Sequence, residues 1–158
     1  MNGLEQARER ALRYLSHRDR TRWEVEQKLT QEGFDPDTVR GVMATLEEYR
    51  YVDDARYATA YLRERLDYGG RGLAQIRREL QGKGIDPILL EETLQGANEL
   101  DAAVKTLTVK WRGIAAASAT IGTGQRKKAV DFLLRRGFSV ETAREALKRY
   151  DVPMQDWE

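Results

Sequence analysis

The sequence contains no cysteine, which excludes disulfide bonds and thiolate metal sites. It has only three prolines and one histidine, so helix breakers are scarce and no second imidazole is available for a metal or a catalytic relay. No apolar run reaches the roughly 18 residues that a membrane span needs, and the charged N-terminal stretch lacks the apolar core of a secretory signal. We therefore expect a cytoplasmic protein that makes no membrane contact.

Charged residues make up 34% of the chain and hydrophobic residues 41%, while the formal net charge is only +1. This balance suits helices that each bury one apolar stripe and expose the rest of their surface. Alanine, leucine, glutamate, arginine and glutamine are plentiful, and all of them favour helices. Basic and acidic stretches alternate along the chain. The composition predicts an all-α protein without the strong positive charge that is typical of duplex-DNA binders.

Three segments of the chain, 25–46, 76–97 and 129–150, align with one another. Each has an apolar residue, a leucine four positions later and a glycine four positions after that. The glycines, Gly33, Gly84 and Gly137, lie 51 and 53 residues apart. We predict that each glycine ends a helix with positive φ, and that the Asp or Ser two residues later caps the next helix. The period therefore predicts a repeated helical hairpin.

A further helix is predicted before each hairpin, at about 4–18, 54–67 and 100–113, and Asp53 or Asp54 is expected to cap the second of these. The whole pattern predicts an all-α fold of three tandem three-helix repeats, elongated and curved. The predicted repeats span residues 1–52, 53–98 and 99–158, the last with a short C-terminal tail. The glycine-rich join at 69–72 is expected to be a flexible linker, and the small-residue join at 114–124 is expected to be mobile.

No set of residues for catalysis emerges from the sequence. His17 has no carboxylate pair or second histidine nearby, so we interpret it as a solvated residue near a helix end. Asp53 and Asp54 are adjacent and could hold a metal, but a helix cap is the favoured interpretation. Neither 69–72 nor 122–128 has the P-loop spacing. We expect no enzyme activity, no cofactor and no metal.

Two dense groups of basic residues fall at or on the second helix of the second and third repeats. They lie off the apolar face, so they are expected to project outward. One interpretation is a solvated surface, and the other is contact with an acidic partner or with nucleic-acid phosphates. Trp23 and Trp111 are interpreted as core or repeat-interface residues. The candidate partner-binding residues are Arg71, Arg77, Arg78, Lys83, Arg126, Lys127, Lys128, Arg135 and Arg136.

Three-helix units of this kind are also compatible with a helix-turn-helix that binds DNA. A glycine turn stabilises any helical hairpin, whatever its function, so the pattern alone does not select DNA. Direct binding to single-stranded or duplex DNA is the alternative function.

The segments at 11–34, 51–72, 76–86 and 132–147 resemble those of the RecX family, the bacterial regulators of the RecA recombinase. The strongest stretch is the Asp-Asp-x-Arg-aromatic-Ala start followed by the Gly-Arg-Gly turn and Ile-Arg-x-Glu-Leu. Two positions depart from the family pattern: Leu73 replaces a frequent proline and Gln75 replaces a frequent arginine.

The resemblance implies a monomeric modulator that binds the RecA nucleoprotein filament, and possible contact with its single-stranded DNA. It implies inhibition of the filament's ATPase, strand-exchange and co-protease activities, and so a role in recombination, DNA repair and the SOS response. It also implies an architectural role for Asp53, Asp54, Arg56 and Tyr57 and leaves the basic groups as contact candidates.

Overall fold

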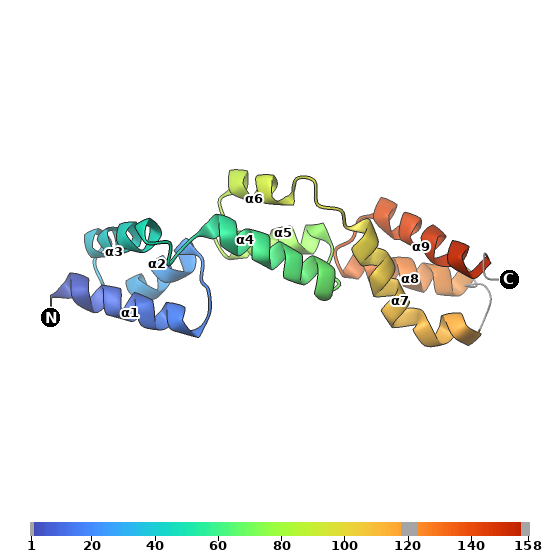
Figure 1. The fold of residues 1–158 in the computed structure, drawn as a ribbon, viewed down its shortest axis with the longest axis horizontal. Coiled ribbons are helices and arrows are strands. Elements are labelled where there is room, and N and C mark those ends of the chain that lie inside the picture. The colour runs from blue at the N-terminus through green and yellow to red at the C-terminus, as the bar shows by residue number, and fades with distance from the viewer. Residues whose placement is uncertain (1, 118–122, 156–158) are drawn as a thin grey trace. The chain divides into compact units, whose positions relative to one another are not determined.

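The structure is a computed structural model that describes the backbone of residues 2–117 and 123–155 and the side chains of 2–110 and 124–149. These residues form nine α-helices and one π-helical segment, and no strand occurs among them (Figure 1). The all-α prediction is confirmed. The elements are α1 (Gly3–His17), α2 (Arg22–Gln31), α3 (Pro36–Glu48), α4 (Asp54–Arg63), η1 (Glu64–Tyr68), α5 (Leu73–Gly82), α6 (Pro87–Leu94), α7 (Leu100–Ala117), α8 (Thr123–Arg135) and α9 (Val140–Gln155).

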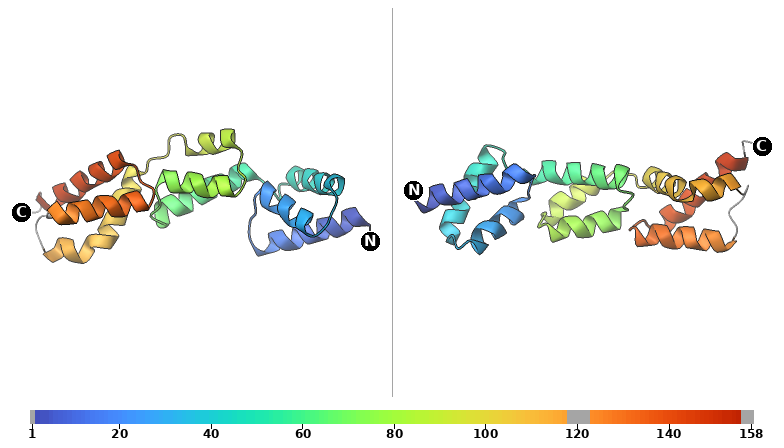
Figure 2. Two further views of the ribbon diagram at one scale, coloured as in Figure 1. Left: turned by 180° about the vertical axis from the view of Figure 1, so that it is seen from behind. Right: turned by 90° about the horizontal axis from the view of Figure 1, so that it is seen from below.

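The chain divides into two compact units. The first unit comprises Met1–Tyr61 and Leu80–Thr93, and the second comprises Leu62–Glu79 and Leu94–Glu158. In the first unit α1, α2 and α3 pack against one another, and in the second α7, α8 and α9 do so (Figure 2). The division into repeats at 1–52, 53–98 and 99–158 stays a prediction, because both units contain part of 53–98.

The three repeated glycines end their helices in the same way. Gly33, Gly84 and Gly137 have φ values of 93°, 76° and 93°, which confirms the predicted left-handed conformation. After each glycine, the backbone N–H of the next residue donates back to the helix. In the first case Phe34 N donates to Leu29 O at 3.2 Å. The turn therefore satisfies carbonyl groups that the end of the helix would otherwise leave unpaired.

The caps after these turns also follow the prediction. The side chain of Asp35 accepts from Thr38 N at 2.8 Å, and Asp86 and Ser139 make the corresponding bonds to the starts of α6 and α9. Pro36 and Pro87 occupy the first position of α3 and α6, where a missing N–H has no intrahelical partner to lose.

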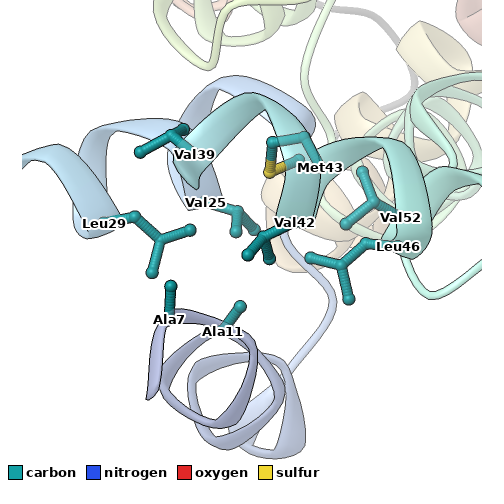
Figure 3. Close-up of a cluster of buried hydrophobic side chains, with 9 residues drawn as sticks. All are labelled: Ala7, Ala11, Val25, Leu29, Val39, Val42, Met43, Leu46 and Val52. Atoms are coloured by element: carbon teal, nitrogen blue, oxygen red, sulfur yellow. The ribbon is translucent and has the colours of Figure 1, made fainter. Parts of the chain in front are cut away.

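One core cluster of the first unit is formed by nine buried apolar side chains (Figure 3). The small side chains on α1 leave room for the longer ones that α2 and α3 contribute. These buried residues are Ala7, Ala11, Val25, Leu29, Val39, Val42, Met43, Leu46 and Val52.

Within the first unit, the turn at Gly84 lies against the start of α2. Thr21 caps α2 by accepting from Glu24 N, and its Oγ1 donates to Lys83 O at 2.6 Å. A Cβ on Gly84 would overlap the side chain of Trp23. The predicted interface role of Trp23 is thus supported, although 43% of this residue remains exposed. The side chain of Trp111 lies outside the described residues.

Within the second unit, the turn at Gly137 lies against the start of α5 in the same manner. Gly72 N donates to Arg136 O at 2.8 Å, and Ala74 N donates to Gly137 O at 3.2 Å. A Cβ on Gly72 would overlap the backbone of Gly137. The glycine-rich join at 69–72 is therefore a packed contact and not the flexible linker that its composition predicted.

Two helices differ from their predicted lengths. The predicted helix at 54–67 continues as α4 and then as the π-helical η1, in which Gly69 N donates to Glu64 O. The predicted helix at 100–113 extends through Ala117, so the first part of the predicted mobile join is helical. Alanine-rich sequence favours this extension. Residues 118–122 of that join lie outside the described residues.

Candidate partner-binding surface

The first basic group is only partly available to a partner. Arg71 is half-buried, and its Nη1 forms an ion pair with Glu79 Oε1 at 2.7 Å, so it supports α5 from within the second unit. Arg77 is also half-buried, whereas Arg78 is exposed. The expectation that both project outward is thus correct for Arg78 and only partly so for Arg77.

Lys83 belongs to the first unit and has a structural position. Its carbonyl accepts from Thr21, and its ammonium lies 5.8 Å from the centre of the Tyr61 ring. Tyr61 in turn stacks on Tyr57, with ring centres 6.1 Å apart. These contacts connect Lys83 to the cap of α2 and to the Tyr61 ring of α4, on which Tyr57 stacks.

The second basic group is more exposed. Arg126, Lys127, Lys128 and Arg135 are exposed side chains of α8. Arg136 is half-buried, because its guanidinium lies 5.3 Å from the centre of the Phe132 ring. Most of the exposed basic side chains among the candidates therefore belong to the second unit.

Part of this second group lines a pair of adjoining clefts in the second unit. The first cleft has a volume of about 190 Å³. The neighbouring cleft shares Lys110 and Phe132 with it and adds Lys128, Asp131 and Arg135. The residues of the first cleft are Asp67, Tyr68, Gly69, Gly70, Lys105, Thr106, Val109, Lys110, Phe132 and Arg136.

Lys105 and Lys110 of α7 belong to this surface, yet they lie outside the dense basic runs of the sequence. Lys105 Nζ donates to Asp67 O at 3.3 Å and lies 5.4 Å from the centre of the Tyr68 ring. Lys110 lies 5.6 Å from the centre of the Phe132 ring. Their spacing relative to Val109 and Thr106 places these residues on one face of a helix, which is the sequence signal that could have identified them.

An acidic cleft lies in the first unit, around the start of α4. Asp53 caps α4 by accepting from Arg56 N, and Arg56 Nη2 donates to Arg50 O at 3.2 Å. Asp54 instead accepts from the backbone N–H of Arg22, the first residue of α2. The architectural roles expected for Asp53, Asp54 and Arg56 are consistent with these bonds, and of the two carboxylates it is Asp53 that caps α4.

Burial raises the pKa of Asp54, and the hydrogen bond from Arg22 N lowers it by less than burial raises it. The Arg22 side chain forms ion pairs with Glu26 at 2.7 Å and with Glu47 at 2.9 Å. The cleft is therefore lined by ion pairs and hydrogen bonds that connect the starts of α2 and α4.

In the part of the chain that the structure describes, no group of three His, Cys, Asp or Glu residues is placed to hold a metal ion. None of the described helices is long and apolar enough to cross a bilayer. His17 is an exposed residue in the last turn of α1.

Two family models match the chain. The first, described as "RecX, first three-helix domain", matches residues 7–46, and the second, "RecX, second three-helix domain", matches residues 53–94. The matched ranges correspond to α1–α3 and α4–α6, and together they cover more than half of the chain.

Individual proteins agree with these matches. The chain is 33% identical over 147 residues to regulatory protein RecX of Halorhodospira halophila, covering 93% of this chain and 89% of that protein. It is 30% identical to regulatory protein RecX of Bacillus licheniformis, covering 93% of this chain and 56% of that protein. The crystal structure of RecX from Lactobacillus salivarius superposes with a TM-score of 0.83 at 26% identity, covering 95% of this chain and 97% of that one. The chain belongs to the RecX family of regulatory proteins.

Proposed function

We propose that this protein binds the RecA nucleoprotein filament and inhibits its ATPase, strand-exchange and co-protease activities. The regulatory family supplies the expectation of RecA as the partner. The structural observation that supports it most directly is the concentration of exposed cations on α8, beside the clefts around Phe132. Such a surface is complementary to acidic protein or to phosphates, both of which a nucleoprotein filament offers.

The chemistry of the second unit favours binding over turnover. Lysines and arginines outnumber the two carboxylates, Asp67 and Asp131, in the lining of these clefts, and such cations hold anions. Several weak charge contacts on one rigid helix act together, because each later contact forms within a complex that already exists.

The test is a titration of RecA ATPase on single-stranded DNA with the intact protein. We expect inhibition at amounts below one molecule per RecA, and weaker inhibition by the double variant Lys128→Glu, Arg135→Glu. The control is Arg144→Glu, Lys148→Glu on α9, which changes charge equally at two other exposed positions. No inhibition at a several-fold excess over RecA would contradict the proposal.

A comparison of the protein's affinity for naked single strands with its affinity for RecA-coated strands distinguishes direct DNA binding from this function. A filament regulator binds the coated strand more tightly. Equal or tighter binding to the naked strand would favour the DNA-binding alternative.

A further inference from the structure

The cleft between α7, α8 and the end of η1 combines an uncovered apolar surface with positive charge. Val109 is 65% exposed and Tyr68 is 80% exposed, although both are large apolar side chains. Lys105, Lys110 and Arg136 line the same cleft, and they outnumber its one carboxylate, Asp67. Exposed apolar side chains framed by charge are typical of a binding site.

The size of the cleft limits its ligand. The cleft has about 190 Å³, and the neighbouring cleft that shares Lys110 and Phe132 with it has about 260 Å³. Gly70 and Thr106 approach each other closely in the lining, because a Cβ on Gly70 would already lie 3.0 Å from Thr106 Oγ1. The cleft thus has room for a single large side chain, with the rest of the ligand lying across the cations.

The arrangement of charge favours a peptide over a nucleic acid. Lys110 and Arg136 lie 5.6 and 5.3 Å from the Phe132 ring centre, and Lys105 lies 5.4 Å from the Tyr68 ring centre. A base that stacked on either ring would therefore have to compete with these cations. Carboxylates would instead approach these cations from outside without displacing them. The small apolar floor and the cationic edge together match an acidic segment that carries one apolar anchor.

We propose that this cleft binds an acidic peptide segment of a partner protein, with one large apolar side chain packed against Val109 and Tyr68. The carboxylates on either side of that anchor pair with Lys105, Lys110 and Arg136. This site goes beyond the proposed function, because it depends on the chemistry of the segment and not on which protein carries it.

The experiment uses the full chain and three fluorescent probes, followed by anisotropy. The first is a ten-residue peptide of aspartate and glutamate with one central phenylalanine, and the second has serine in its place. The third is a ten-nucleotide thymidine strand. We expect the phenylalanine peptide to bind most tightly.

Two variants test the two halves of the site. Lys105→Glu, Lys110→Glu should weaken binding of the phenylalanine peptide about tenfold, because two attractions become repulsions. Val109→Ser should abolish the preference for phenylalanine over serine while keeping the charge contribution. All three substituted positions are exposed, so the fold should persist, and circular dichroism checks this. Arg144→Glu, Lys148→Glu is the matched control and should bind like the wild type.

Three results would overturn the site. The first is binding of both peptides with equal affinity, or of neither. The second is unchanged binding by the lysine variant. The third is tighter binding of the thymidine strand that the same lysine variant weakens, which would identify a nucleic-acid site. None of these results bears on RecA ATPase inhibition, so failure here leaves the proposed function standing.

Discussion

Gly33, Gly84 and Gly137 share one backbone conformation but have different surroundings. No atom lies within 4 Å of the position that a Cβ on Gly33 would take, whereas a Cβ on Gly84 would overlap Trp23 and one on Gly137 would lie 2.6 Å from Gln75 Cβ. The first glycine thus serves only to end a helix. The other two also allow another segment to pack against the turn.

This difference gives a matched pair of substitutions. Gly33→Ala should lower the free energy of unfolding by about 1 kcal/mol, the usual cost of a left-handed non-glycine residue. Gly84→Ala should cost at least about 1 kcal/mol more, because the added methyl group also displaces Trp23. Urea unfolding of both variants measures the difference. Equal losses of unfolding free energy in the two variants would show that Trp23 can move away from the added methyl group without destabilising the protein.

Asp54 should make stability depend on pH. Because burial raises its pKa above the ordinary 3.8, the folded protein holds a proton that the unfolded chain has already released. Stability from this group therefore falls as the pH rises from the ordinary pKa through the raised one, and is constant above it.

Asp54→Asn keeps an oxygen that can accept from Arg22 N but removes the titration. We expect its unfolding free energy, relative to wild type, to increase as the pH rises from the ordinary pKa of an aspartate through the raised pKa of Asp54, and then to level off. Glu48→Gln, at the exposed end of α3, controls for the loss of one negative charge. A pH-independent difference between Asp54→Asn and wild type would rule out this role for burial.

Local rules predicted the conformation of single residues well. The glycine turns and the caps at Asp35, Asp86 and Ser139 depend on neighbours within a few positions, which the sequence displays directly. Arg50 could not be predicted in this way. It has φ 58° two residues after the end of α3, whereas α6 is followed at the same distance by Gly96 with φ 77°. The side chain of Arg56 donates to the Arg50 carbonyl.

At the scale of elements, the starts of α2 and α5 depend on carboxylates from later in the chain. Asp54 accepts from Arg22 N in the first unit, and Glu99 Oε2 accepts from Leu73 N in the second. The free N–H groups and positive dipole at a helix start make this a favourable place for a carboxylate. The interacting positions are 32 and 26 residues apart, so helical periodicity could not reveal them.

Glu99 also holds the start of α9, because its Oε1 accepts from Ser139 N at 3.0 Å and from Thr142 Oγ1 at 2.8 Å. Glu99→Ala removes the acceptor for all three donors and should lower the free energy of unfolding by about 2–3 kcal/mol. Glu92→Ala, on the exposed face of α6, should change it by less than about 0.5 kcal/mol. If Glu99→Ala lowers the free energy of unfolding no more than Glu92→Ala does, water must accept from the three donors as well as the Glu99 carboxylate does.

At the scale of the whole molecule, the repeat period predicted the helices. It did not predict the contacts by which one three-helix repeat stabilises a helix of another. Composition suggested that 69–72 was a linker, because glycine-rich sequence is usually flexible. The same glycines are required where two backbones approach closely, and only the three-dimensional contact between Gly72 and Gly137 distinguishes the two uses. Likewise, the clefts of the second unit combine residues from α7 and α8 with the end of η1, which no local pattern connects.

Removal of the predicted third repeat should therefore disturb the second. A chain that ends at residue 98 lacks Arg136 O and Glu99, the acceptors for Gly72 N and Leu73 N. We expect amide hydrogen exchange at 72–76 to become faster in this truncated chain, while α1–α3 keep their protection. Unchanged exchange at 72–76 would show that these bonds add little to the stability of α5.

Filament binding itself should weaken with salt. If exposed lysines and arginines of α8 carry the contact, raising the salt from 50 to 200 mM should reduce the affinity for RecA-coated strands. The variant Lys128→Glu, Arg135→Glu should show a shallower dependence, and the α9 control should not. A salt-independent affinity would assign the contact to apolar surface.

The turns at Gly84 and Gly137 pack against the starts of α2 and α5, and this affects how the chain folds during its synthesis. Thr21 Oγ1 cannot donate to Lys83 O until Lys83 has left the ribosome. Likewise, Gly72 N cannot donate to Arg136 O until Arg136 has done so. At about 5–20 residues per second, each helix start stays incomplete on the order of several seconds after it is made. Maturation then follows translation from one end to the other, and a chain stalled before Gly137 would expose the unfinished start of α5 to proteases.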